Sequence, residues 1–320
     1  MNRLTSHAAA LAAACALCAG AASAQTPYVL DEQRNQSNFS FSGDTSIGPI
    51  LGNPSNDFEV DGIVDILLTP SGGGFSTGEF DGGHLYTVPS TLMAKIPNPF
   101  PFLPPLATID IVDAVYRASS PSFSVNPSTG DFNATVTLSA TNGYTEVTYL
   151  GITSTTTLIG TQSDPTPVSG RAYISGTQTI LDMPIDAAFH IDDPGSGITA
   201  DVNLDGRIVA ASDSASKPLV LRVGTLQAST TGTFTVTDGS PNTFTYLAYS
   251  VAGLGDTFVA QLSVTLGIRN PVQAGGAQRT NALGTTIWNL PIPSNAGGLG
   301  VRLQAAQFGK ASNIWLTTVL

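Results

Sequence analysis

Cysteine is almost missing from this sequence of 320 residues: the chain has two, Cys15 and Cys18, both near its start. The first 24 residues have the three parts of a secretory signal peptide, namely a basic start at Arg3, an apolar stretch from Ala8 to Gly20 and a small-residue cleavage site at Ala24. Cleavage there removes both cysteines. We therefore expect the exported chain to form no disulfide and to hold no thiol nucleophile or thiolate metal site.

Charge is also scarce, at 11% of the chain, and acidic residues outnumber basic ones by 23 to 12. Cleavage removes one basic residue and no acidic one, so the formal net charge of −11 becomes −12. A chain this acidic lacks the basic surface that nucleic acid or anionic lipid requires. We therefore expect no nucleic-acid partner. The apolar stretch of the signal is too short to span a bilayer, and we expect no transmembrane segment in the mature chain.

Helical periodicity is missing from the mature chain, whereas segments that alternate apolar and polar residues recur throughout it. Clusters of Gly, Pro, Asn and Asp bound these segments, as is typical of short antiparallel strands. The sequence therefore predicts an all-β fold of two antiparallel β domains: a large N-terminal sandwich or barrel and a smaller C-terminal β-sandwich. The clearest predicted strands are 58–67, 107–116, 132–140, 145–152, 179–191 and 198–204 in the first domain, and 233–237, 245–251, 257–266, 285–290, 300–306 and 313–320 in the second.

A short polar segment that ends in proline marks the predicted domain boundary. Residues 214–218 lack strand character and finish at Pro218, as a linker does. We expect residues 25–213 to form the N-terminal β-domain. Residues 219–320 should form a separate C-terminal β-sandwich module, for which their number is sufficient.

Two family resemblances bear on these domains. The C-terminal third contains Asn281-Ala282-Leu283-Gly284, Trp288-Asn289-Leu290-Pro291-Ile292-Pro293, Val301-Arg302-Leu303-Gln304-Ala305-Ala306 and Ser312-Asn313. In these motifs it resembles a C-terminal module of secreted, mostly uncharacterised proteins of aquatic bacteria. The resemblance implies an adhesion-like or structural β-sandwich with no established catalytic role.

The start of the mature chain carries a second, shorter resemblance. Its motifs are Tyr28-Val29-Leu30-Asp31, Ser37-Asn38-Phe39-Ser40-Phe41 and Phe58-Glu59-Val60-Asp61-Gly62. They are similar to the opening of the YceI family, whose members are exported lipocalin-like barrels that hold isoprenoid lipids. This resemblance implies a barrel around an apolar ligand, although it does not continue beyond Leu68.

Asp201, Asn203 and Asp205, followed by Gly206, resemble the start of an EF-hand or dockerin calcium loop. Such a loop places oxygen ligands at positions 1, 3 and 5 and a glycine at position 6. The pattern fails at position 12, where Ser212 stands in place of a bidentate carboxylate. Asp205-Gly206 is also a strong type I′ turn signal. The sequence therefore predicts a β-hairpin here, with bound calcium as the alternative and no other cofactor.

The segment from Pro97 to Pro105 contains five prolines separated by apolar residues. Proline cannot donate a hydrogen bond to a sheet, so this segment must be an extended loop. Phe100, Phe102 and Leu103 in this loop either plug one end of the N-terminal domain or contact a partner or a lipid. These three are the candidate binding residues.

Residues 74–78 match the Gly-x-Ser-x-Gly pattern of a catalytic serine, and a triad of Ser76, His190 and Asp193 can be drawn. That motif requires a following helix, which the sequence does not predict, so we interpret the match as chance and expect no catalytic residues. His84 and His190 are the only histidines of the mature chain. They are too few for a histidine zinc site, and we expect structural or surface roles for both.

The sequence thus predicts an exported, non-enzymatic structural or interaction protein of the surface or adhesion type. Its partner would be a surface, a polymer or an apolar ligand that the sequence does not identify. The alternative is a carrier of lipid or another apolar ligand, with the N-terminal domain as the enclosing barrel. We expect the protein to be extracellular, at the cell surface or in the periplasm.

Overall fold

The computed structural model describes residues 26–32, 36–100, 102–195, 197–213 and 217–320. The predicted signal peptide and residues 214–216 of the predicted linker lie outside the described residues. Antiparallel sheets make up nearly all regular structure in the described part, which confirms the all-β prediction. No helix in these ranges is both long enough and apolar enough to cross a membrane.

The N-terminal domain is built from β-strands that share one extensive sheet. They are β1 (Thr26–Glu32), β2 (Asn38–Thr45), β3 (Gly48–Pro49), β4 (Leu51–Gly52), β5 (Asp57–Ser71), β6 (Gly74–Val88), β7 (Thr91–Ile96), β8 (Ala107–Ser119), β9 (Phe123–Ser124), β10 (Asp131–Tyr149), β11 (Ile152–Thr157), β12 (Thr166–Ser175), β13 (Gln178–Asp193) and β14 (Ile198–Asp213).

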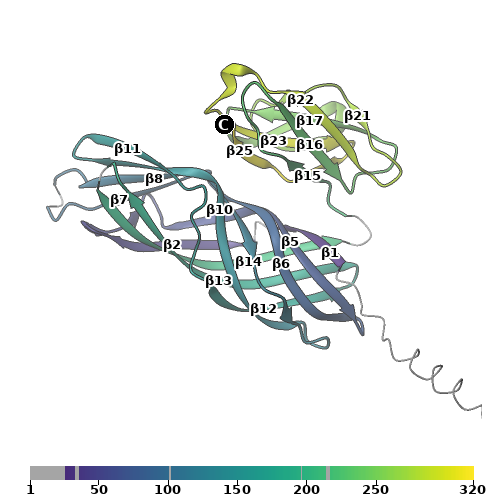
Figure 1. The fold of residues 1–320 in the computed structure, drawn as a ribbon, viewed down its shortest axis with the longest axis horizontal. Helices are drawn as coiled ribbons and strands as arrows, with labels where there is room; N and C mark the ends of the chain where they lie inside the picture. Colours follow the sequence, from purple (N-terminus) through teal and green to yellow (C-terminus); the bar gives the residue numbers. More distant parts are fainter. Residues whose placement is uncertain (1–25, 33–35, 101, 196, 214–216) are drawn as a thin grey trace, which may run out of the picture.

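This sheet closes on itself as a barrel. The ring runs β8–β10–β12–β13–β14–β1–β5–β6 and returns to β8, and all of its pairings are antiparallel. Along other stretches of the same strands, β2 replaces β1 as the strand between β14 and β5, and β7 replaces β6 as the partner of β8. Because neighbours in the ring are also neighbours along the chain, the barrel has an up-and-down topology. Figure 1 shows it as an elongated body below the C-terminal domain.

Alternation of side chains fills the barrel. Along β13, Leu181, Met183 and Ile185 point inward and are buried, whereas Asp182 and Asp186 point outward. Buried apolar residues of the neighbouring barrel strands join these inward residues in one continuous apolar core. The choice between sandwich and barrel is therefore decided by the closed ring of pairings.

Several predicted strand boundaries are wrong, and the hairpin at Asp205-Gly206 is the clearest case. β14 runs unbroken through both residues, paired with β13 on one side and β2 on the other. A Cβ atom at position 206 would lie 2.5 Å from the ring of Phe39. Glycine is thus needed for the close approach of β2 and not for a turn.

Other differences follow from bulges and glycines. The predicted strands 132–140 and 145–152 merge into β10 through a bulge between Ala140 and Tyr144. The glycine-rich segment 74–88, which includes the Gly-x-Ser-x-Gly match, is strand β6. The predicted strand 257–266 is divided by the 3-10 helix Ala260–Leu262.

The C-terminal domain has sheets and a core of its own. The last barrel strand ends at Asp213 and the next strand begins at Val220, on either side of the predicted linker. Its elements are β15 (Val220–Val223), β16 (Thr231–Thr237), β17 (Phe244–Ser250), β18 (Leu254–Val259), β19 (Val264–Ile268), β20 (Val272–Gln273), β21 (Gln278–Arg279), β22 (Thr286–Pro291), β23 (Gly300–Gln307), β24 (Lys310–Ala311) and β25 (Trp315–Thr318), with 3-10 helices η2 (Ala260–Leu262) and η3 (Ser294–Ala296).

The C-terminal domain packs on the outer face of the barrel (Figure 1). Tyr86 of β6 and Val115 of β8 join an apolar cluster with Leu266, Ile268 and Leu316 of the C-terminal domain. These barrel residues are buried although they point away from the barrel core, because the second domain covers them. The described domains are therefore one packed unit.

Polar contacts fix the docking of the two domains. Asp113 of β8 pairs with Arg302 of β23, and both side chains are almost fully buried. Asp65 of β5 forms two hydrogen bonds with the guanidinium of Arg222, at 2.6 and 2.8 Å. At the β10 bulge, the side-chain oxygen of Asn142 accepts a hydrogen bond from a backbone N–H of β25 at 2.9 Å.

Candidate functional site

The loop that carries the candidate binding residues lies at one end of the barrel. Strand register places the end of β7 (Ile96), the start of β8 (Ala107), the end of β10 (Tyr149) and the start of β11 (Ile152) side by side. The 97–106 loop and the β10–β11 turn therefore project from the same end. In Figure 1 this is the end where β7, β8 and β11 are labelled.

Five large apolar side chains are exposed there, and we call them the apolar tip. Phe100, Phe102 and Leu103 come from the loop, and Leu150 and Ile152 come from the β10–β11 hairpin. Phe102 is 82% exposed and Leu150 is 76% exposed. The loop residues therefore do not plug the barrel. Sequence reasoning missed the two hairpin residues, because only the register of β10 with β8 brings them to the same end as the loop.

The apolar tip is held in shape and carries no charge. The N–H of Leu106 donates to the carbonyl of Ile96 at 2.9 Å and closes the base of the loop. Within the loop, the N–H of Leu103 donates to the carbonyl of Phe100, and the Phe100 and Phe102 rings lie 5.9 Å apart. Segments 96–109 and 147–163 contain no Asp, Glu, Lys or Arg. The tip is thus an electrically neutral apolar surface.

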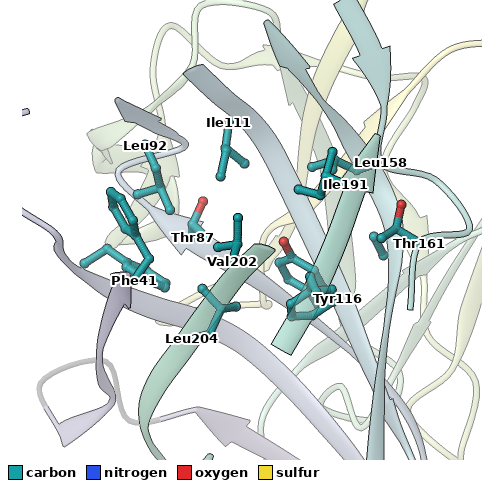
Figure 2. Close-up of a pocket in the computed structure, with 13 residues that line it drawn as sticks. Phe41, Thr87, Leu92, Ile111, Tyr116, Leu158, Thr161, Ile191, Val202 and Leu204 are labelled. Atoms are coloured by element: carbon teal, nitrogen blue, oxygen red, sulfur yellow. The ribbon is translucent and has the colours of Figure 1, made fainter. Parts of the chain in front are cut away.

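The interior of the barrel offers a second candidate site, because the end nearer the apolar tip contains two small cavities. Their volumes are about 20 and 30 Å³. They share lining residues, and Figure 2 shows the first. Three hydroxyls lie among its apolar side chains, those of Thr87, Tyr116 and Thr161. The Thr87 oxygen has no hydrogen-bond partner among the described residues, and burial raises the pKa of Tyr116 to about 12. The shared residues are Phe41, Ile111, Ile191 and Val202.

These cavities are far smaller than a lipid site. A cavity of 20 to 30 Å³ has room for about one water molecule, whereas pockets for drug-sized ligands occupy roughly 300 to 1,000 Å³. An isoprenoid chain could enter only if the core expanded. The filled interior therefore gives little support to the carrier hypothesis.

The three candidate calcium ligands do not converge on one point, as a calcium site requires. Asp201, Asn203 and Asp205 project outward from alternate positions of β14, so their side chains spread over roughly 13 Å along the strand. Calcium requires its oxygen ligands within about 2.6 Å of one point. Asp201 is also hydrogen-bonded to Nδ1 of His190, at 2.7 Å. Among the described residues, no three His, Cys, Asp or Glu side chains cluster as a metal site.

The candidate triad of Ser76, His190 and Asp193 does not assemble. Ser76 donates a hydrogen bond to the backbone carbonyl of Thr69. His190 lies on the outer surface, where the hydrogen bond to Asp201 raises its pKa, with a further contribution from the charge of Asp192. Asp193 is buried and binds the hydroxyls of β11. These three residues have separate local partners.

The comparisons with known proteins add no family. No protein-family model, curated protein or solved structure gives a significant match to the chain.

Proposed function

We propose that this chain is an exported, non-enzymatic interaction protein that attaches through its apolar tip to a neutral lipid surface. The observation that carries the proposal is the gathering of five exposed apolar side chains at one end of the barrel, on two segments that contain no charged residue. Contiguous exposed apolar patches mark interaction sites, because their exposure to water is unfavourable.

The charge pattern supports a neutral lipid surface over an anionic one. The chain has a net charge of −11, so an anionic membrane would repel it. The tip itself adds neither attraction nor repulsion, and its phenylalanines and leucines suit the apolar side of a lipid interface. Burial of the Phe102 side chain alone would contribute about 2 kcal/mol, or roughly 30-fold in binding.

Co-sedimentation with phosphatidylcholine vesicles tests the proposal. Wild-type protein should pellet with the vesicles, and F102S should weaken binding by roughly 30-fold. F308S is the matched control, because Phe308 is 72% exposed but belongs to the C-terminal domain. Binding that is absent in wild type, or equal in wild type and F102S, would overturn the proposal. Concentration-dependent dimers that F102S abolishes, without vesicle binding, would assign the tip to a second copy of the chain instead.

A further inference from the structure

A cleft opens where the C-terminal domain meets the barrel, away from the apolar tip. Its volume is about 660 Å³, within the range of small-molecule sites, and such sites favour domain interfaces. The barrel contributes one wall through Asp61, Val88, Pro89 and Ser90. The hairpin of β18 and β19 contributes the opposite wall, and the residues before β25 complete the lining.

The hairpin wall presents charges without partners. Arg269 and Asp256 are exposed in the cleft, and neither side chain has a hydrogen bond or ion pair within the described part of the chain. The Arg269 side chain lies against residue 255, where a Cβ atom would fall 2.6 Å from its Nε. Residue 255 is a glycine with φ of 146°, so it allows this close approach. The guanidinium is thereby kept at the cleft wall.

The lining combines these charges with apolar contact surface. Asp61 on the barrel wall supplies a second carboxylate across the cleft. Pro89, Leu254 and Ile314 supply apolar surface between the polar groups. A ligand that fits must therefore offer hydrogen-bond donors to carboxylates, acceptors to a guanidinium, and C–H surface to the apolar residues.

From this lining we infer that the interdomain cleft is a binding site for a neutral polyhydroxylated ligand, namely a segment of an uncharged polysaccharide. Sugar hydroxyls both donate and accept, so they can pair with Asp256 and Arg269 at once. The C–H faces of the sugar rings can pack on the apolar lining. An anionic ligand would face the carboxylates of Asp256 and Asp61, a cation would face Arg269, and a purely apolar ligand would leave the charges of Asp256 and Arg269 desolvated.

The shape of the surface favours a polymer over a single sugar. A second, more open groove of about 930 Å³ lies along β2 and β5 of the barrel and shares Val88 and Pro89 with the cleft. It is lined by polar residues that include Asn38, Ser40 and Glu59. A chain seated in the cleft can therefore continue across the barrel.

Affinity electrophoresis in gels that contain dextran, β-glucan, mannan, xylan or galactomannan tests this site. At least one neutral polysaccharide should retard the wild-type protein. The double variant R269A/D256A should weaken that binding at least tenfold. Both residues are exposed, and its melting temperature should match that of wild type. The matched control is R117A/D44A, which removes one exposed arginine and one exposed aspartate outside the cleft and groove.

The inference stands if retardation is lost in R269A/D256A and kept in R117A/D44A. It fails if none of the five polysaccharides retards the wild type, or if R269A/D256A is retarded equally. It also fails if only cationic chitosan or anionic alginate binds. The tip variant F102S should retain polysaccharide binding, so the result is independent of the lipid proposal.

Discussion

Protonation of His84 should loosen the docking of the C-terminal domain on the barrel. The imidazole stacks on Trp315, with ring centroids 4.0 Å apart, and its Nε2 accepts a hydrogen bond from the N–H of Leu316 at 3.0 Å. A ring nitrogen that accepts a hydrogen bond carries no proton, so protonation must break this bond. Burial, with a smaller contribution from the charge of Arg222, lowers the pKa of His84 to about 3.

The size of the effect follows from the difference between the folded and unfolded pKa values. In the unfolded chain the pKa of His84 is 6.5, so the unfolded state takes up the proton first as the pH falls. The contribution of neutral His84 to stability is fully present above pH 6.5 and is lost progressively down to about pH 3. At about 1.4 kcal/mol per pH unit, a change from pH 8 to pH 5 should cost about 2 kcal/mol.

Urea unfolding of wild type and H84Q at pH 8 and pH 5 measures this cost. A glutamine oxygen can still accept the bond from Leu316 but does not titrate, so H84Q should lose about 2 kcal/mol less than wild type. His190 is the control, because its pKa is raised mainly by the hydrogen bond to Asp201. H190Q should therefore change the pH dependence in the opposite direction. Equal losses in wild type and H84Q would refute the reasoning.

Two further predictions concern the interdomain ion pairs and calcium. R302M should lower the free energy of unfolding by about 3 kcal/mol, because it leaves Asp113 buried without its partner. R222M should lower it by about 1 kcal/mol or less, since Arg222 is 40% exposed. Chemical denaturation that ranks the two variants in the reverse order would contradict this account. Addition of millimolar calcium or of a chelator should leave the melting temperature unchanged, because Asp201, Asn203 and Asp205 do not converge on one point. A rise of more than about 2 °C with calcium in differential scanning calorimetry would reveal a site.

Alternation and turn residues were sufficient to predict the β-class but not the strand ends. The Asp205-Gly206 signal is purely local, whereas β14 gains partners on both sides from distant segments. Those partners override the turn, since Gly206 leaves the space that Phe39 occupies. The β10 bulge is similar: a break in alternation that resembles a turn instead redirects Asn142 toward β25.

The docking of the two domains was the largest omission, and its trace lies in the burial of the barrel strands. The run from His84 to Thr87 is buried at every position, whereas a strand with one solvated face alternates. The same holds for Asp113 to Val115 on β8. Such runs indicate strands that are covered on both faces, but they do not identify the covering surface. The cleft was unpredictable for the same reason, since its walls come from different domains.

The candidate loop was found from composition alone. Its prolines exclude sheet pairing, and its apolar residues stand out between them. Leu150 and Ile152 were not found, because in sequence they are ordinary residues around Gly151. The pairing of β8 with β10 in the barrel brings the 97–106 loop and the β10–β11 turn together as one apolar tip.

The most direct test of lipid attachment is the depth of the tip in a bilayer. F102W places a fluorescent side chain at the most exposed loop position of the tip, and phosphatidylcholine brominated on its acyl chains quenches indoles that reach the apolar layer. F308W provides the same probe on the C-terminal domain. We predict that brominated vesicles quench the added emission of F102W and leave that of F308W unchanged. Equal emission of F102W with brominated and ordinary vesicles would contradict the account.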